Sequence, residues 1–482
     1  MAEARVATAP VLAVMCLGTF MAILDTSLVN LGLKTIQQDL HAEMATLQWV
    51  IDLYNLAYAA LIITGGTLGD LYGRRRIFLI GVGVFAAGSL VCALAPNAIV
   101  LVLGRGIAGV GAAFLLPVAL AILNVTYPDA RARARAIAIW GGMNGLAMAI
   151  GPTLGGVLVD AFGWRSLFYA VLPVAGVTMA MAPGWVPESS DPKGRTLDLR
   201  GQILAVLTLG TLCLGFIQGP SWGWHSWRLL LCAAGFVASA VAFLFVERAS
   251  ASPLIPLAMF RNRAFSAAIA DATLMTFGMY GLLFVLPLFL QSMRGATATL
   301  AGLELLPMSV SFFVVSLGTG RAVAALGPRI LISVGMCLTG GGLFMLAAVS
   351  QRSGYAAIAA ALLAVGLGLG LITGPIATAA VANAPVARSG MSSGLVNVGR
   401  MVGATLGVAI LGILFGAHIA ETARDPARFL EALRAAFLIG GVAQLCGALI
   451  ALICFHRGAL EGPQGRPGAA ASASPRADSR AD

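Results

Sequence analysis

Long apolar stretches follow one another along the chain and are separated by short polar segments. Each contains about 20 mainly apolar residues, the length of helix that crosses the hydrocarbon core of a membrane. The fourteen stretches cover residues 11–33, 47–69, 77–95, 98–123, 136–160, 166–186, 201–218, 228–246, 265–290, 300–320, 329–350, 355–381, 391–416 and 434–456. This pattern predicts an all-α polytopic membrane protein with fourteen transmembrane helices.

Composition supports this fold class. Of the 482 residues 59% are hydrophobic and only 10% are charged, with a mean hydropathy of +0.92. A soluble domain carries about 25% charged residues, so a water-soluble globule of this composition is excluded. The net charge of +10 does not indicate nucleic-acid binding, because no basic face is interleaved with aromatic residues. The first apolar stretch is too long for a signal-peptide core and is expected to remain as a helix.

The distribution of basic residues predicts the orientation in the membrane. If both termini are cytoplasmic, twenty of the thirty Lys and Arg residues fall on the cytoplasmic side and eight on the opposite side. The remaining two, Arg105 and Arg400, fall inside helices. Basic residues are enriched in cytoplasmic loops of membrane proteins. We therefore expect a multi-pass protein of the cytoplasmic (inner) membrane with both termini inside.

A weak internal repeat predicts two related halves. A shift of 254 residues aligns Gly66, Gly73 and Arg75 with Gly320, Gly327 and Arg329, while Asp70 falls on Ala324. Paired repeats of this kind build the central sites of many transporters. The expected architecture is two pseudo-symmetric six-helix bundles plus two inserted helices. Its parts are a cytoplasmic N-terminus (1–10), an N-terminal bundle (11–186), a linker with two inserted helices (187–263), a C-terminal bundle (264–456) and a disordered cytoplasmic tail (457–482).

Two opposite charges lie at matching depth in the first half. Asp25 is about eight residues, or ~12 Å, from the outer end of its helix, and Arg105 is ~10 Å from the same end at 1.5 Å per residue. An unpaired charge inside a membrane costs several kcal/mol, so the two are expected to meet. Such an acid can bind and release a proton, which makes the pair a candidate for proton coupling. The alternative is a static pair that holds the first and fourth helices together.

Three further acids lie inside or near the ends of apolar stretches. Asp52, Asp271 and Glu304 are secondary candidates for a proton or cation site, and a structural role is an equal alternative for each. Asp52 and Glu304 both lie near the predicted outer face. Glu304 can reach water there by extending its side chain.

A short glycine-rich turn carries one acid and three arginines, in the sequence GGTLGDLYGRRR at residues 65–76. Glycines permit close backbone approach and tight turning. The acid can dock on a helix N-terminus while the arginines hold an inner gate. A simple positive anchor would explain the arginines but not the acid and the glycines. The gating candidates are Gly65, Gly66, Asp70, Gly73, Arg74 and Arg75.

The fifth helix combines small residues with a proline in GGMNGLAMAIGPTLGGVL at residues 141–158. Small residues let membrane helices approach closely, and proline bends a helix. Packing alone explains much of this pattern. The candidates for a bending motif are Gly151, Pro152, Gly155 and Gly156. Candidates for a substrate cavity, chosen by residue type and helix position, are Tyr54, Asn55, Asn144, Phe277, Tyr280 and Asn397.

Motifs of soluble catalysis are absent from the sequence. Residues 104–109 spell GxGxxG but lie inside a membrane helix, so dinucleotide binding is not expected. The sequence has no GxxxxGK[ST] or HExxH motif. The seven cysteines lie in apolar stretches without metal-binding spacing and are expected to be buried structural thiols. We therefore expect no enzyme activity, no cofactor and no metal site, and an ion gradient as the energy source.

Several segments together resemble the major facilitator superfamily, and in particular its fourteen-spanner drug:proton antiporters. GGTLGDLYGRRR resembles the loop signature between helices two and three, LDTSLVNL the first-helix signature, and LVLGRGIAGVGAA the fourth-helix arginine signature. AIGPTLGGVL followed by FGWRSLFY resembles the antiporter motif, and RGATATLAGLELLPMS the start of the tenth helix. Methylenomycin-resistance-type exporters are similar. The resemblance covers residues from about 11 to 456.

The resemblance implies a cavity between two bundles that rock between inward-facing and outward-facing states. It implies that Asp25 and Arg105 couple proton movement to substrate release, that Asp70 stabilises one state, and that the motif at 151–156 is associated with export. We therefore expect proton-coupled efflux of small lipophilic toxic compounds or antibiotics by a monomer in contact with membrane lipids. The alternatives are a proton-coupled symporter or metabolite exporter of the same fold, and a membrane-embedded enzyme or sensor.

Overall fold

The computed structural model describes residues 8–192, 197–250, 253–350, 353–384, 389–422 and 426–455, and in these ranges it contains helices and no strands. The elements are α1 (Thr8–Leu40), α2 (Met44–Tyr72), α3 (Arg74–Ala93), α4 (Ala98–Thr126), α5 (Ala130–Phe162), α6 (Arg165–Tyr169), α7 (Val171–Trp185), α8 (Leu199–Trp222), α9 (Trp227–Ala249), η1 (Leu257–Arg261), α10 (Arg263–Ser292), α11 (Ala298–Glu304), α12 (Leu306–Ala347), α13 (Tyr355–Ala382), α14 (Ser389–Thr422) and α15 (Pro426–Cys454). The predicted all-α class is confirmed.

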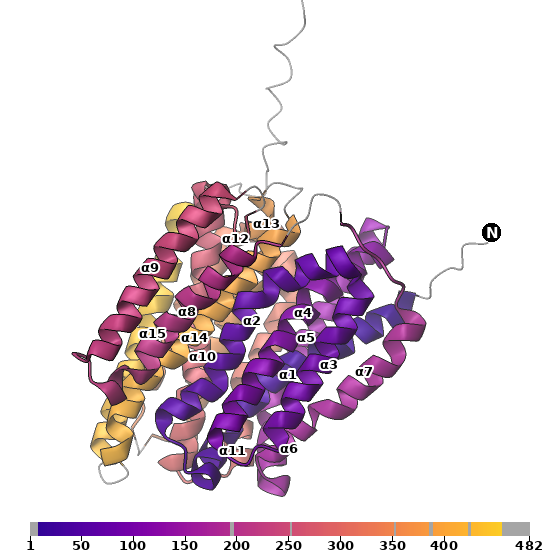
Figure 1. Cartoon of the computed structure of the whole chain (residues 1–482). Helices are drawn as coiled ribbons and strands as arrows, with labels where there is room; N and C mark the ends of the chain where they lie inside the picture. The colour runs from indigo at the N-terminus through magenta and orange to yellow at the C-terminus, as the bar shows by residue number, and fades with distance from the viewer. Residues whose placement is uncertain are drawn as a thin grey trace, which may run out of the picture.

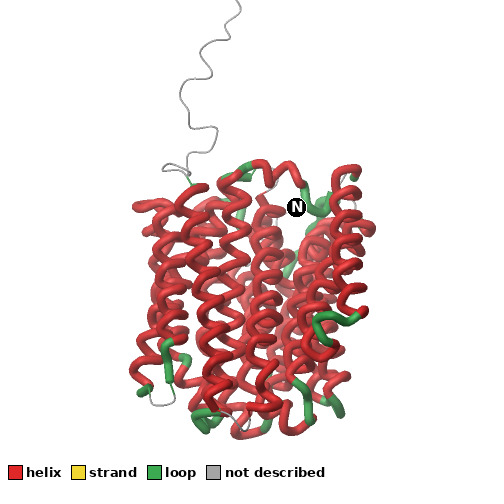
Figure 2. The backbone as a smooth tube through the Cα atoms, turned by 90° about the vertical axis from the view of Figure 1, so that its left-hand side faces the viewer, coloured by secondary structure: helices red, strands yellow, loops and turns green. Residues whose placement is uncertain are grey.

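Thirteen helices of the described ranges are long and apolar enough to cross a membrane. One of them, α12, has 42 residues and would be ~63 Å long as a single straight helix, about twice the thickness of a hydrocarbon core. Its course is interrupted at Gly327, whose backbone is non-helical at φ 76° and ψ 162°. The helical rods in Figure 2 nevertheless have similar heights. The element α12 therefore comprises two spans joined at Gly327, which gives the fourteen predicted crossings.

The break at Gly327 matches a turn in the first half. Gly73, which lies 254 positions earlier, joins α2 to α3 with φ 104° and ψ 126°. Both glycines thus occupy the positive-φ region that residues with a Cβ atom rarely adopt. The residues Arg75 and Arg329 stand two positions after these glycines. The backbone geometry supports the repeat predicted from the sequence.

The helices form one bundle in which neighbours in space are often distant in sequence (Figure 1). Helices α1 to α5 and α7 pack mainly on one another, as do α10 and α12 to α15. The pair α8–α9 packs together, and α8 also contacts α2 and α14. Figure 1 shows α9 at the margin of the bundle, with α8 between α9 and α2. The two inserted helices therefore lie beside the contact between α2 and α14.

Short breaks at one end of the bundle differ from the sequence prediction. The predicted stretch 300–320 is divided into α11 and α12 at Leu305, where Pro307 occupies the first turn of the new helix. Proline favours the first turn because its missing N–H group needs no partner there. Figure 1 shows α6 and α11 together at the bottom of the view. We call this the Leu40 end, after the last residue of α1, and the opposite end the Gly73 end.

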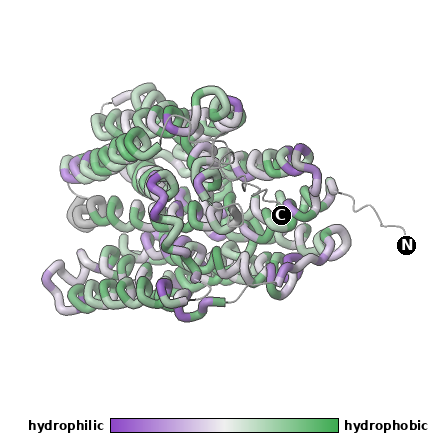
Figure 3. The backbone as a smooth tube through the Cα atoms, turned by 90° about the horizontal axis from the view of Figure 1, so that it is seen from above, coloured by the Kyte–Doolittle hydropathy of each residue, from purple (hydrophilic) through white to green (hydrophobic). Residues whose placement is uncertain are grey.

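Apolar side chains occupy both the interior and the outer surface of the bundle. Hydrophobic positions dominate the helices in Figure 3, and many large apolar residues, such as Phe245 and Leu317, are exposed. The prediction that all cysteines are buried is wrong, because Cys337 and Cys446 are exposed on helix surfaces. An apolar stretch in a membrane protein can face lipid as readily as core, so hydropathy alone does not distinguish the two.

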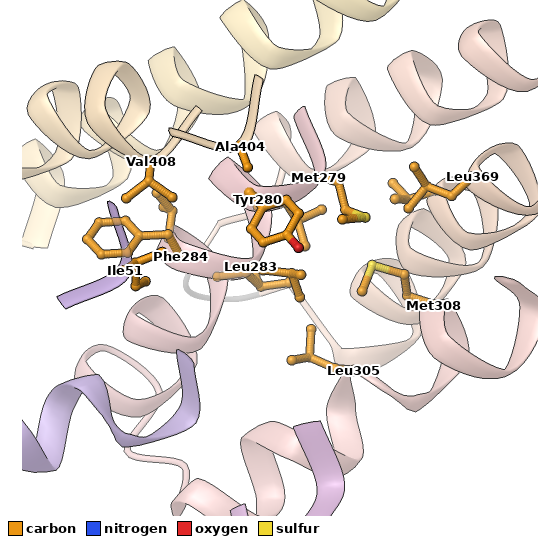
Figure 4. Close-up of a cluster of buried hydrophobic side chains, with 14 of the residues drawn as sticks. Ile51, Met279, Tyr280, Leu283, Phe284, Leu305, Met308, Leu369, Ala404 and Val408 are labelled. Carbon is orange, nitrogen blue, oxygen red and sulfur yellow. The ribbon is translucent and has the colours of Figure 1, made fainter. Parts of the chain in front are cut away.

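The main core connects helices of both halves. Figure 4 shows part of it, with Phe284 of α10 close to Val408 of α14 and Ile51 of α2, and with Tyr280 and Met279 on the same helix. Helix α10 is buried along most of its length. It therefore forms one wall of the interior space in which the polar residues described below are found.

Candidate functional site

A buried ion pair joins α1 to α4. The Arg105 Nη1 atom lies 2.5 Å from Asp25 Oδ2, and both side chains are 1% exposed. The second carboxylate oxygen of Asp25 is buried without a hydrogen-bond partner. The two charges that the sequence placed at equal depth thus meet, and the acid keeps one oxygen unused.

Three neighbours hold the guanidinium group of Arg105. Its Nε donates a hydrogen bond of 2.8 Å to the carbonyl oxygen of Val50 on α2. Its central carbon lies 4.3 Å from the ring centre of Tyr54 and 5.9 Å from that of Phe168. An arginine over an aromatic face is attracted by the ring quadrupole. Arg105 therefore has partners other than Asp25.

Tyr54 connects this pair to a central cavity of about 160 Å³. The Tyr54 hydroxyl donates to the carbonyl oxygen of Ala22 at 3.2 Å, and its ring stacks near that of Tyr58 with centres 6.4 Å apart. The cavity is lined by Ala22, Ile23, Thr26, Ser27, Tyr54, Tyr58, Leu116, Met148, Met275, Thr276, Met279, Tyr280, Leu283, Phe312, Thr373, Asn397, Arg400 and Met401. Helices of both halves contribute to it, as expected of a central site.

The six cavity candidates chosen from the sequence divide evenly. Tyr54, Tyr280 and Asn397 line the cavity. Asn55, Asn144 and Phe277 are not among its lining residues. Asn55 is fully buried and its amide has no partner, whereas the Phe277 backbone packs against Gly407 of α14. Residue type and helix number could not fix which face of a helix points inward.

Arg400 is the charged residue among the described residues that line the cavity, and it was not predicted from the sequence as a site residue. Its Nη2 donates to the Thr373 carbonyl oxygen at 2.9 Å, and its own carbonyl oxygen accepts from Thr276 Oγ1 at 2.6 Å. Its position as one of two basic residues inside predicted helices was the available signal. Arg105 was distinguished by an acid at matching depth in its own half, and no such pairing was predicted for Arg400.

None of the three secondary acids is among the residues that line this cavity. Both carboxyl oxygens of Asp52 and both of Asp271 are buried without hydrogen-bond partners. Asp52 lies near Cys213 of α8. Asp271 lies beside α15, where a Cβ atom on Gly447 would come within 3.4 Å of its Oδ1. Glu304 ends α11, and Arg294 is the basic group beside it.

The 65–76 turn is held by contacts within the first half. Asp70 accepts hydrogen bonds from Arg74 Nε at 2.9 Å and from Arg74 Nη2 at 2.7 Å. The acid at the N-terminus of α3 is Glu188, which accepts from the backbone N–H groups of Arg75 and Arg76. Gly65 and Gly66 face α4, where a Cβ on Gly65 would lie 2.5 Å from the Ala113 oxygen. Glu188 was not recognised from the sequence because it lies more than a hundred residues away.

The small residues of α5 make close contacts with two helices. A Cβ atom on Gly151 or Gly155 would collide with Ser27 or approach Leu28 on α1. A Cβ atom on Gly156 would lie 2.3 Å from the backbone oxygen of Ala298 on α11. Pro152 lies inside the helix, and its carbonyl oxygen faces Gly302 of α11. The motif therefore lets α5 pack against α1 and α11 at backbone distance.

Hydrogen bonds between the two sets of helices gather toward the Leu40 end. Asp160 of α5 accepts from the backbone N–H groups of Ala298 and Thr299 at 3.1 and 2.7 Å. Gln291 of α10 donates to the Leu31 oxygen at 3.2 Å. Gln48 of α2 donates to the oxygens of Val408 and Ala409, both at 3.1 Å. The cavity is thus closed on the Leu40 side by direct contacts between α1, α2 and α5 and α10, α11 and α14.

In the part of the chain that the structure describes, a bundle of long apolar helices with a buried ion pair beside a central cavity defines an integral multi-pass membrane protein. The Major Facilitator Superfamily model matches residues 15–408. The chain belongs to this superfamily.

The similar proteins of known name are resistance and export proteins. The chain is 39% identical over 411 residues to "Multidrug resistance protein Stp" of Mycobacterium tuberculosis (strain CDC 1551 / Oshkosh), covering 84% of this chain and 75% of the relative. It is 33% identical over 443 residues to "Methylenomycin A resistance protein" of Bacillus subtilis (strain 168), covering 91% and 93%. It is 33% identical to "Tetracenomycin C resistance and export protein" of Streptomyces glaucescens, covering 86% and 77%.

Solved structures share the fold at low identity. The crystal structure of the peptide transporter POT in complex with sulfate has a TM-score of 0.67 at 15% identity, covering 92% of this chain and 93% of that one. The crystal structure of a mutant of the nucleoside transporter NupG has a TM-score of 0.65 at 12% identity, covering 93% and 100%. These likenesses concern the fold.

Proposed function

We propose that this protein exports small lipophilic toxic compounds or antibiotics across the cytoplasmic membrane in exchange for protons. The names of the similar resistance and export proteins support this direction of transport. The largely apolar lining of the central cavity supports a lipophilic substrate. The sequence contains no P-loop motif, so a proton gradient is the energy source that we assign.

The observation that carries the proposal is the buried Asp25–Arg105 pair next to the cavity wall. Asp25 has a free carboxylate oxygen that can accept a proton. Once Asp25 is neutral, Arg105 retains the Val50 carbonyl and the Tyr54 ring. Because Tyr54 also lines the cavity, movement of Tyr54 by a bound substrate changes the surroundings of Arg105. Proton and substrate thus act on one shared group of residues.

The contacts at the two ends support a mechanism of alternating access. In the orientation with both termini cytoplasmic, the Leu40 end faces outward. The contacts of Asp160 with α11 and of Gln48 with α14 close this outer end. The bonds of Asp70 and Glu188 at the cytoplasmic end join α2, α3 and the segment that follows α7, and do not reach the second half. Export then requires that the outer contacts break and that α5 move away from α11, with Pro152 as the flexible point.

The secondary acids Asp52 and Asp271 have roles in this mechanism that differ from that of Asp25. Asp52 lies on α2 beside α8 and near the contact with α14, which has to change during alternation. An unpaired charge there would cost several kcal/mol, so protonated Asp52 is compatible with the closed outer end. Asp271 lies against α15 and is not among the residues that line the cavity. We assign proton coupling to Asp25 first and a secondary role to Asp52.

Transport direction tests the proposal in everted membrane vesicles. We expect vesicles that contain the protein to accumulate lipophilic antibiotics when the interior is acidified, with methylenomycin A and tetracenomycin C as the first compounds tested. A protonophore should abolish the accumulation. Vesicles without the protein are the control. Accumulation only in right-side-out vesicles under an inward proton gradient would instead establish an uptake symporter.

A further inference from the structure

The central cavity has an uncompensated positive charge. Arg400 is the one charged residue among the described residues that line it. The remaining lining residues are apolar, or are Ser, Thr, Tyr and Asn residues without formal charge. Arg400 lies eleven residues after the start of α14, or ~17 Å along the helix at 1.5 Å per residue. The charge is therefore near the middle of the membrane and reachable from the cavity.

The hydrogen bonds of Arg400 leave donors unused. Its Nη2 is bound to the Thr373 carbonyl oxygen, and its Nε is buried without a partner. Within the described ranges, no carboxylate oxygen lies within 4.0 Å of its side-chain nitrogens. The titratable groups beside it are the phenols of Tyr58 and Tyr280. Arg105, by contrast, has both a carboxylate and a ring.

We propose that the cavity binds lipophilic organic acids, with a carboxylate of the substrate paired to Arg400 and its apolar body among Met275, Met279 and Phe312. The guanidinium group presents five N–H donors in a fork that matches a carboxylate. The proposal rests on the proposed function only in taking this cavity as the substrate site. A lipophilic cation at the same place would be repelled by Arg400, so the cavity discriminates by charge.

Two tyrosines connect an acid bound at Arg400 to the Asp25–Arg105 pair. Tyr58, which lies beside Arg400, stacks near Tyr54, and Tyr54 lies under Arg105. The two tyrosines are one helical turn apart on α2, so they link the two arginines through one rigid segment. An outward-moving anion is also driven by an inside-negative membrane potential. Export of an acid in exchange for a proton therefore moves net charge across the membrane.

Binding to the purified full-length protein in lipid nanodiscs tests the proposal. The probes for isothermal titration calorimetry near neutral pH are 2-naphthoate, its neutral amide 2-naphthamide and the cation benzyltrimethylammonium. We expect the wild-type protein to bind 2-naphthoate at least about tenfold more tightly than the amide and not to bind the cation, since a charged hydrogen bond is worth roughly 1.5–3 kcal/mol. Equal affinity for acid and amide, or tighter binding of the cation, would overturn the proposal without any variant.

Variants then locate the charge. We expect Arg400→Gln to weaken 2-naphthoate binding by about tenfold or more for the same reason and to leave amide binding unchanged, with Arg400→Lys in between. The matched control is Arg321→Gln, an equal loss of charge at an exposed site on α12 outside the cavity lining. Thermal unfolding of each variant establishes that it is folded. If folded Arg400→Gln binds the acid as well as wild type does, the proposal is wrong.

The experiments distinguish a failure of the acid-binding proposal from a failure of the proposed function. If protons still exchange for a neutral antibiotic while 2-naphthoate does not bind, only the acid-binding inference is lost. If no compound exchanges with protons but acid binding depends on Arg400, the binding site stands and the antiport proposal is lost.

Discussion

At the scale of single residues, the two arginines inside the helices differ. The charge of Arg105 is neutralised by Asp25, whereas Arg400 lines the cavity. Arg105 has Asp25, a backbone carbonyl and an aromatic face. Arg400 has a backbone carbonyl and a buried Nε atom without a hydrogen-bond partner. Removing one partner of a buried pair costs about 3–5 kcal/mol, because the other charge stays buried. The two partners of the Asp25–Arg105 pair are not equivalent, because a carboxyl group can become neutral and an arginine cannot.

This asymmetry predicts unequal effects on stability. We expect Asp25→Leu to lower the thermal midpoint in detergent more than Arg105→Met, because the first variant leaves an arginine without its counterion. The double variant should recover much of the loss, as apolar replacements of buried pairs often do. Fluorescence-monitored unfolding of the four proteins forms a double-mutant cycle. Additive losses in the double variant would show that the two residues do not interact in the folded protein.

At the scale of helices, α5 determines how closely the halves meet at the Leu40 end. Gly156 allows the α5 backbone to contact the α11 backbone, and Asp160 binds two N–H groups at the start of α11. An added methyl group in a packed contact costs about 1–3 kcal/mol. The contact therefore has enough energy to shift an equilibrium between closed and open outer ends.

We expect Gly156→Ala to favour the outward-open state by weakening the α5–α11 contact. The measurement is the distance between spin labels at the Leu40 ends of α5 and α11, whose distribution should move to longer values. Gly142→Ala on the same helix is the matched control, because a Cβ atom there meets nothing within 4 Å. An unchanged distribution for Gly156→Ala would contradict the role of this contact in closing the outer end.

The positions of the helices along the chain were largely predictable from the sequence. Which face of each helix points toward the cavity was not. Apolar length predicted the crossings, and the glycine repeat predicted the break at Gly327 inside α12. The pairing of Asp25 with Arg105 followed from depth and the cost of burying a lone charge. The sequence could not predict which of the candidates line the cavity, because a helix in a membrane is apolar on all sides. Arg400 and Glu188 lacked a local partner in sequence that would have indicated their roles.

At the scale of the whole molecule, the proposed direction of transport depends on which end of the bundle faces the cytoplasm. The basic residues of segments 74–76 and 131–135 predict that both segments lie inside. We expect a C-terminal green fluorescent protein fusion to fluoresce and a C-terminal alkaline phosphatase fusion to be inactive. The same reporters fused after residue 296, in the segment between α10 and α11, should give the opposite pair of results. Phosphatase activity at the C-terminus would reverse the orientation and with it the proposed direction of transport.

The most direct test of the central claim is proton movement in proteoliposomes that contain a pH-sensitive dye and an imposed proton gradient. Addition of a transported compound should trigger proton movement opposite to the compound. This movement should be lost in Asp25→Asn and kept in Asp271→Asn, the same change at a buried carboxyl that is not among the cavity-lining residues. Wild-type exchange in Asp25→Asn, or protons moving in the same direction as the compound, would contradict proton antiport through the Asp25–Arg105 pair.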